Sequence, residues 1–381
     1  PLHATLAEKG AVFTQTFAWE RPQWFSLDGR EEECSYRRNN VFDVVRAECE
    51  AVRNRVGVID MTGFAKYDVR GAGAEAFLNR LLANRMPKRD GGMALAHFLS
   101  RQGRILGEAT VTRIANDHFY LLSAASAELR DLDHLLQQRE EGEAVEITNA
   151  TEQRGVMVVA GPRSRELLAT LTDAPLDNAS FPWRSAQEIE LAGVKTLALR
   201  INYVGELGWE LHPRMADLET LYAAVWAAGE AHGIANFGLY ALNSLRMEKA
   251  YRGWGAELTN EVTMLEADMA RFFNGKKDDF IGKLATETRD TGPLQLVYFS
   301  VDAVDADVRG GEPIFVGDDC VGVTTSGGYG HAVEQSLGFG YVPPAQAIPG
   351  SVLEVGLLDA RCQATVLTDP AYDPANQRLM S

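Results

Sequence analysis

Cysteine is scarce in this chain, and its placement argues against two kinds of structural site. The four cysteines, Cys34, Cys49, Cys320 and Cys362, lie far apart and form no CxxC pair. This pattern fits neither a disulfide framework nor a cysteine-ligated zinc site. We therefore expect a reducing, cytoplasmic compartment and no metal centre.

Long apolar runs and an excess of positive charge are also missing. No apolar run approaches membrane-spanning length, and the first residues lack the basic and apolar parts of a signal peptide. The chain has 53 acidic and 37 basic residues, a formal net charge of -16. A surface of that charge repels phosphate backbones and anionic lipid. We expect no nucleic-acid partner and no membrane partner.

The general catalytic motifs are absent as well. The sequence contains no GxSxG elbow, no HExxH pair, no GxxxxGK[ST] loop and no strand-borne GxGxxG fingerprint. The run Gly71-Ala72-Gly73 lacks a third glycine, so a turn between a strand and a helix explains it best. Common hydrolase, kinase and dinucleotide-binding chemistries lose support.

The pattern of apolar residues predicts an α+β chain of two or three modules, the number expected for 381 residues. Between positions 65 and 145 the order is strand, helix, strand, strand, helix, strand, which is typical of a split βαβ unit. A comparable series starts again at Gly155. The sequence therefore predicts two ferredoxin-like α/β modules.

The amino-acid composition changes after Leu284, where glycine and proline become frequent and the expected strands are short. This pattern favours a small β-barrel or a β-sandwich that extends to about Asp369. We predict a domain over residues 1–284 and a C-terminal β-barrel domain over residues 285–381. The polar segment 285–293 is the expected linker.

Two acidic segments are candidates for chemistry. Glu108 is a lone carboxylate where a glycine turn enters an apolar strand, and partial burial there would suit a general base. A solvated turn glutamate is the alternative. Glu206 lies in a glycine-bearing turn between Tyr203 and Trp209, which together could hold a flat heterocycle with an amino-pyrimidine edge. A β-hairpin with core aromatics explains the same residues.

Several segments in the right order resemble the folate-binding aminomethyltransferase family. The run FAWERPQWF resembles the start of the folate half of dimethylglycine and sarcosine dehydrogenases. YVGELGWE resembles the signature Y-x-G-E-x-G-x-E, and LNSLRME resembles D-x-L-R-x-E with Asn in place of Asp. The similarity extends from about Ala11 to Val342. The further matching segments are 57–62, 279–283, 325–329 and 337–343.

The resemblance implies a three-domain, clover-like arrangement with tetrahydrofolate in a central channel. By family position, Glu108 is the acid that contacts N10 and assists proton removal. Glu206 corresponds to the acid that holds the pterin edge, with Tyr203 as its aromatic neighbour and Arg246 as the arginine that supports the folate tail. The further residues implied as apolar walls of the folate site are Phe64 and Phe98.

The resemblance leaves three functions open. The first is a demethylase that passes a methyl group from a small methylated amine, sulfonium or ether donor to tetrahydrofolate, as the related dimethylsulfoniopropionate demethylase does. The second is the acceptor half of a dimethylglycine or sarcosine dehydrogenase system, which forms methylenetetrahydrofolate with a flavin dehydrogenase partner. The family's aspartate is replaced here by Glu108, and the dehydrogenase-linked members resemble this chain more.

The third function is a non-catalytic folate-binding factor. Relatives of that kind carry a K-G-C-x-x-G-Q-E signature, and the corresponding segment here, KAYRGWGAE, lacks the cysteine. The donor itself is less defined by the sequence. Tyr251, Trp254 and Trp183 could box a cationic donor through their ring faces, although core packing also explains these aromatics.

Overall fold

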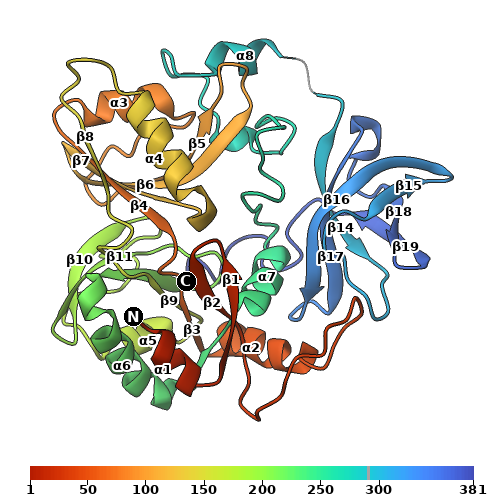
Figure 1. The fold of residues 1–381 in the computed structure, drawn as a ribbon, viewed down its shortest axis with the longest axis horizontal. Coiled ribbons are helices and arrows are strands. Elements are labelled where there is room, and N and C mark those ends of the chain that lie inside the picture. Colours follow the sequence, from red (N-terminus) through yellow and green to blue (C-terminus); the bar gives the residue numbers. More distant parts are fainter. Residues whose placement is uncertain (290–291) are drawn as a thin grey trace.

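The computed structural model describes residues 1–289 and 292–381, and it forms three lobes (Figure 1). Asp290 and Thr291, which belong to the expected linker, lie outside the described residues. The rest of that linker is partly helical, because α8 (Lys283–Thr288) covers its start. The four cysteines are all free.

The first lobe contains a five-stranded antiparallel sheet in the order β5-β6-β7-β4-β8. Without β5 this is the split βαβ order that the sequence predicts, with α3 and α4 covering one face. Strand β5 was missed, because its run MALAHFL is almost wholly apolar and shows no alternation. The elements are β4 (Ala65–Arg70), α3 (Ala74–Leu81), β5 (Met93–Leu99), β6 (Ile105–Ala115), β7 (His118–Ser123), α4 (Glu128–Gln137) and β8 (Glu146–Asn149).

The second lobe repeats this arrangement, as the restart at Gly155 predicts. Its six-stranded sheet has the order β10-β11-β12-β9-β3-β13, in which β3 from the N-terminal part of the chain is inserted between β9 and β13. The strands are β3 (Val56–Asp60), β9 (Met157–Ala160), β10 (Ala186–Leu191), β11 (Val194–Leu199), β12 (Gly208–Pro213) and β13 (Ile234–Asn236).

Helices cover both faces of this second sheet: α5 and α6 pack on the outer face, whereas α2 and α7 pack against Ile59 and Val158 on the other. Trp209 and Leu211 of β12 pack into a core with residues of α5 and α6. A short N-terminal hairpin lies nearby and contributes Phe25 to that core. The helices are α1 (His3–Glu8), α2 (Phe42–Asn54), α5 (Ser164–Ala169), α6 (Leu218–Gly229) and α7 (Leu239–Glu248), and the hairpin strands are β1 (Ala11–Thr16) and β2 (Trp19–Phe25).

The third lobe is a closed barrel in the order β14-β17-β16-β15-β18-β19, as the sequence predicts. Helix α7 attaches it to the second lobe, because Asn243 donates to the Gly327 carbonyl at 2.9 Å and Ser244 donates to the Tyr329 carbonyl at 2.6 Å. The strands are β14 (Gln295–Val301), β15 (Pro313–Val316), β16 (Asp319–Gly330), β17 (Gln335–Val342), β18 (Val352–Leu357) and β19 (Ala360–Val366).

The segment after the barrel returns to the second lobe, where the C-terminal end lies (Figure 1). The Tyr372 amide donates to the Glu248 carbonyl at 3.0 Å. Arg200 donates to the main-chain oxygen of Ser381 at 2.8 Å. We call residues 369–381 the return segment. It connects the end of the barrel to the sheet of the second lobe.

Candidate functional site

The inner faces of the first two sheets pack against each other. Met93 and Tyr120 of the first sheet share one apolar cluster with Leu197 and Leu199 of the second. Successive side chains of a strand point to opposite faces. The polar residues in register with Met93 and Tyr120 therefore lie on the inner face, between the two sheets.

Glu108 lies on this inner face of β6, directly opposite His97 of β5. Their side chains meet at 2.9 Å, between His97 Nε2 and Glu108 Oε2. The His97 side chain is fully buried, whereas 22% of the Glu108 side chain is exposed. Among the described residues Glu108 Oε1 has no hydrogen-bond partner. Glu108 is therefore a half-buried acid with one oxygen fixed, and not a solvated turn residue.

Tyr203 lies close to Glu108 and joins it to a second group of predicted residues. Burial, and to a smaller extent the charges of Glu257 and Glu108, raises the pKa of Tyr203. Its ring stacks on Tyr251 at a centroid distance of 5.6 Å, and its hydroxyl donates to the Arg252 carbonyl at 2.5 Å. The structure thus brings Glu108, Tyr203 and Tyr251 into one region.

Arg246 belongs to the same region, but its guanidinium is already occupied. It donates to Asn243 Oδ1 at 3.0 Å, to the Tyr251 carbonyl at 3.0 Å and to Glu257 Oε2 at 3.1 Å. A further bond of 2.8 Å reaches Ser326 of the barrel. Arg246 therefore fixes the segment around Tyr251 against the barrel.

Glu206 has a structural environment that differs from the predicted one. Its side chain is 1% exposed and accepts hydrogen bonds from Arg53 at 3.1 Å, from Tyr372 at 2.7 Å and from Arg378 at 2.9 Å. Glu248 pairs with the other side of Arg53 at 2.6 Å. We call these five residues the buried ion cluster. Its three donors occupy the carboxylate that the sequence assigned to the pterin edge.

Glu210, four residues later, is the inner-face acid that the sequence interpretation missed. It lies on β12 with its side chain 11% exposed and forms no hydrogen bond to a described residue. Burial raises its pKa to about 8. His212 Nε2 lies 3.5 Å from Glu210 Oε2 without meeting hydrogen-bond geometry, while His212 Nδ1 bonds Tyr120 at 3.0 Å.

The alternation of apolar and polar residues along β12 is a sequence pattern that could have identified Glu210. Trp209 and Leu211 are apolar and face the helices, so Glu210 and His212 must point to the opposite face. Two polar residues on one face of an otherwise buried strand indicate a functional or hydrogen-bonded surface. His97 offers no such signal, since it lies in an almost wholly apolar run that shows no alternation and is not predicted as a strand.

Phe64 and Phe98, the two residues predicted as apolar walls of the folate site, lie in different parts of the structure. Phe98 lies on the outer face of β5 and packs in the core under α3 and α4, with its ring 5.3 Å from that of His134. Strand alternation thus turns Phe98 away from His97, and its role as a wall of the folate site stays a prediction. Phe64 contacts two apolar clusters, one of them the cluster between the sheets.

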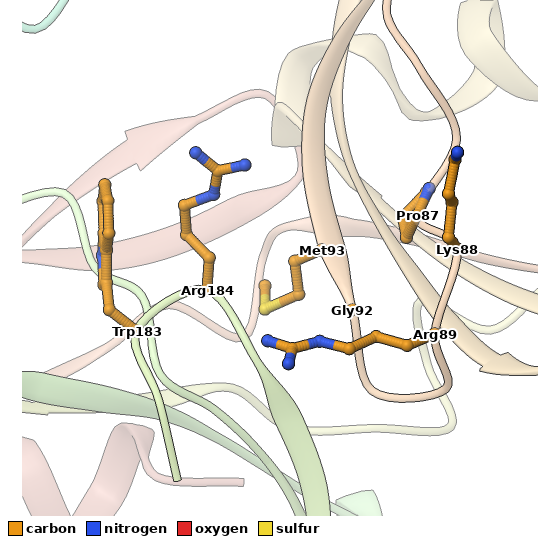
Figure 2. Close-up of a pocket in the computed structure, with 7 residues that line it drawn as sticks. All are labelled: Pro87, Lys88, Arg89, Gly92, Met93, Trp183 and Arg184. Atoms are coloured by element: carbon orange, nitrogen blue, oxygen red, sulfur yellow. The ribbon is translucent and has the colours of Figure 1, made fainter. Parts of the chain in front are cut away.

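The three aromatic residues suggested as a donor box are not gathered in one cavity. Trp254 already has the Arg130 guanidinium over its ring at 4.3 Å and packs against a separate core. Trp183 lines a cavity of about 440 Å³ with Arg184, Met93 and the loop that carries Lys88 and Arg89 (Figure 2). Neither Tyr251 nor Trp254 lines that cavity.

The structure also bears on metals and membranes. Over residues 1–289 and 292–381, no group of three His, Cys, Asp or Glu side chains is placed to hold a metal ion. Within the same ranges, none of the helices combines the length and apolar character needed to cross a bilayer.

Comparison with known proteins identifies the family. Residues 2–277 match the GCVT N-terminal domain, and residues 295–373 match the glycine cleavage T-protein C-terminal barrel domain. The chain therefore belongs to the glycine cleavage T-protein family and is a folate-dependent domain of the aminomethyltransferase type. The family, the fold class and the tetrahydrofolate cofactor expected from the sequence are confirmed.

Individual relatives fall into two groups. The chain is 38% identical to mitochondrial dimethylglycine dehydrogenase of Mus musculus over 99% of its own length and 44% of that protein. It is 29% identical to the aminomethyltransferase of Anoxybacillus flavithermus over 98% of both chains. The chain thus spans less than half the length of the dehydrogenases it matches.

A solved structure confirms the architecture. The aminomethyltransferase T of the glycine cleavage system from Bartonella henselae superposes with a TM-score of 0.85, covers 98% of both chains and is 22% identical. This likeness supports the three-lobed fold.

Proposed function

We propose that this domain accepts a one-carbon unit from a small methylated donor onto tetrahydrofolate bound between the first two sheets. The observation that carries the proposal is the pair of inner-face acids. Among the described residues, Glu108 Oε1 and the carboxyl group of Glu210 have no hydrogen-bond partner, although both side chains are largely shielded from water. A polar ligand between the sheets could bond both groups.

The two acids suit different parts of the folate. A carboxylate can accept two N–H bonds from an amino-pyrimidine edge, and the unpaired side chain of Glu210 has that capacity. We therefore assign the pterin edge to Glu210, since the buried ion cluster occupies Glu206. Tyr120 and His212 flank Glu210 and would close the site to water. Phe64 remains the proposed apolar wall.

Glu108 is the proposed catalytic acid–base group. Tetrahydrofolate supplies nucleophilic nitrogens that capture the one-carbon unit. Glu108 Oε1 would then receive a proton from N10, while Oε2 stays bonded to His97. Tyr203 lies near Glu108 and would exclude water from the reacting atoms. We propose that Arg246 acts by holding the Tyr251 segment in place.

The donor is proposed from the relatives. Because the chain is 38% identical to part of a dimethylglycine dehydrogenase, we favour an N-methylated amino acid oxidised by a flavin dehydrogenase unit, with methylenetetrahydrofolate as product. A redox-neutral demethylase that forms 5-methyltetrahydrofolate is the second candidate. It fits the same two acids, because both routes need a bound folate and a proton acceptor. A reducing compartment remains a prediction in either case.

A mass-spectrometric assay of folate products separates the candidates. The protein is incubated with tetrahydrofolate and a panel of N-methyl, S-methyl and O-methyl donors, first without oxidant and then with a flavin dimethylglycine dehydrogenase. We expect methylenetetrahydrofolate only when the dehydrogenase is present, at a rate above that of the dehydrogenase alone. The appearance of 5-methyltetrahydrofolate without oxidant would establish demethylation instead. No product and no folate binding would refute both candidates.

A further inference from the structure

His97 is the one polar partner of Glu108 and has no role in the function proposed above. It lies on β5, directly opposite Glu108 in the antiparallel register, and its side chain is fully buried. The ring of Phe272 from the short helix η4 (Ala270–Phe272) lies 5.9 Å away at an angle of 52°. The backbone register and this packing hold the imidazole in one place.

The hydrogen bond between the two side chains limits where the ring proton can lie. A carboxylate offers only acceptors, so His97 Nε2 must carry the proton that forms the 2.9 Å bond to Glu108 Oε2. The other ring nitrogen, Nδ1, is buried and has no partner among the described residues. A second proton at Nδ1 would create a buried charge and a buried donor without an acceptor, and both are unfavourable.

We propose that His97 is a positioning residue that holds Glu108 Oε2 through its Nε2–H and so directs Oε1 toward the nitrogen that loses its proton. The inference rests on the proposed role of Glu108. It also separates two possibilities, because a ring with no partner at Nδ1 among the described residues orients the acid without relaying the proton. Glu108 itself is therefore the group that holds the proton.

Other charged or titratable groups near the pair come from two elements. Arg130 and Asp131 of α4 lie behind Gly107, within 3.2 Å of the position that a side chain there would occupy. Tyr203 is a further titratable group, close enough for the charge of Glu108 to raise its pKa. Each of these groups is retained when His97 alone is replaced.

Two substitutions at position 97 separate the hydrogen bond from the packing. His97→Phe keeps a buried ring of similar size without a donor, whereas His97→Gln retains an N–H that can reach the carboxylate. We expect His97→Phe to lower kcat roughly tenfold with an unchanged KM for tetrahydrofolate, since the loss of orienting partners has effects of this order. His97→Gln should recover most of that loss.

The pH profile provides a readout that packing alone would not change. Without its hydrogen-bond donor, the Glu108 carboxylate takes up a proton more readily. The acidic limb of the kcat profile should move upward by about one pH unit in His97→Phe and stay in place in His97→Gln. His134→Phe is the matched control, because His134 packs on Phe98 on the opposite face of the same sheet. It should leave the profile unchanged.

Nitrogen NMR of protein with ¹⁵N-labelled histidine tests the inference without any donor. The chain has seven histidines, so the His97→Phe variant identifies the signal of His97 by its loss. We expect the signals to place the ring proton of His97 on Nε2, the nitrogen that faces Glu108, and not on Nδ1. The Nε2 shift should change in Glu108→Ala.

Distinct outcomes separate the two proposals. A ring proton on Nδ1 in place of Nε2 would overturn the positioning role. So would a His97→Phe enzyme with wild-type kcat and pH profile. Full activity of Glu108→Gln would instead refute the proposed role of Glu108, whatever the NMR of His97 shows.

Discussion

The first and second lobes each place a glutamate beside a histidine on the inner face of a sheet, yet the two pairs differ. In the first lobe the residues lie on neighbouring strands in direct register and meet at 2.9 Å. In the second they lie two residues apart on β12, at 3.5 Å without a hydrogen bond. Cross-strand neighbours approach more closely than same-strand neighbours two residues apart.

This difference in register explains why the two acids suit different tasks. The bond from His97 fixes one oxygen of Glu108 and leaves the other partly exposed, which suits transfer of a single proton. Glu210 accepts no hydrogen bond from a described residue, so its carboxyl group is free to bind a ligand with two N–H groups. Burial raises its pKa to about 8, so the ligand-free acid holds a proton below that pH and releases it when it accepts two N–H bonds. In the proposed site, Glu108 is oriented by His97 before the folate binds, whereas Glu210 gains its hydrogen-bond partners from the folate.

The largest effect is expected at Glu206, which the comparison leaves outside the site. Replacing it with Gln should lower the free energy of unfolding by about 3 to 5 kcal/mol, because Arg53 and Arg378 lose a buried charged partner. Denaturant unfolding measures this change. Glu188→Gln, an exposed residue of β10, is the control. A stable Glu206→Gln protein with impaired folate binding would return Glu206 to the pterin edge.

Glu108→Gln should reduce turnover roughly a hundredfold while folate binding is kept, since the amide cannot accept the proton. Product formation at saturating folate measures turnover, and calorimetry measures affinity. If Glu108→Gln weakens folate binding but leaves turnover unchanged, Glu108 would be a binding residue and the proposed difference between the two acids would be refuted.

Glu210→Gln should show the reverse pattern. An amide offers one acceptor oxygen, so the folate edge loses a charged hydrogen bond worth about 1.5 to 3 kcal/mol, or roughly tenfold to a hundredfold in Kd. Turnover at saturating folate should change only slightly. Equal Kd values for the wild type and the variant would remove Glu210 from the binding site.

The raised pKa of Glu210 also predicts a dependence of stability on pH. The folded protein holds this proton up to about pH 8, whereas the unfolded chain releases it near pH 4.5. The folded state therefore binds more protons between these values, and its free energy of unfolding falls as pH rises through them. Denaturation at several pH values should show a shallower decline for Glu210→Gln, with Glu48 keeping part of the slope. An unchanged slope would contradict this assignment.

The smallest effect on function is expected at Trp254. Its ring already has the Arg130 guanidinium over it, so Trp254→Ala should leave the KM of the donor within about threefold while costing some stability through the lost packing. Kinetics with the donor found in the product assay measures this. A large rise in KM would restore Trp254 to a cationic donor site.

The sequence predicted the repeated α+β lobes and the barrel because these depend on local periodicity. It also pointed to Glu108, whose glycine turn and apolar strand are adjacent in the chain. It could not supply His97 as the partner, because that pairing depends on the register of a strand without alternation. It could not show that Glu206 bonds Arg53, Tyr372 and Arg378, because these contacts span more than 150 residues, and it named no role for Glu210.

The return segment has a consequence for the order in which the protein matures. Arg53 and Glu206 are synthesised in the first and middle parts of the chain, but Tyr372 and Arg378 emerge from the ribosome near the end of the described sequence. Because domains generally fold as they are synthesised, the two sheets can pack while Glu206 still lacks two of its three donors. The final closure of the second lobe must therefore wait for the residues that follow the barrel.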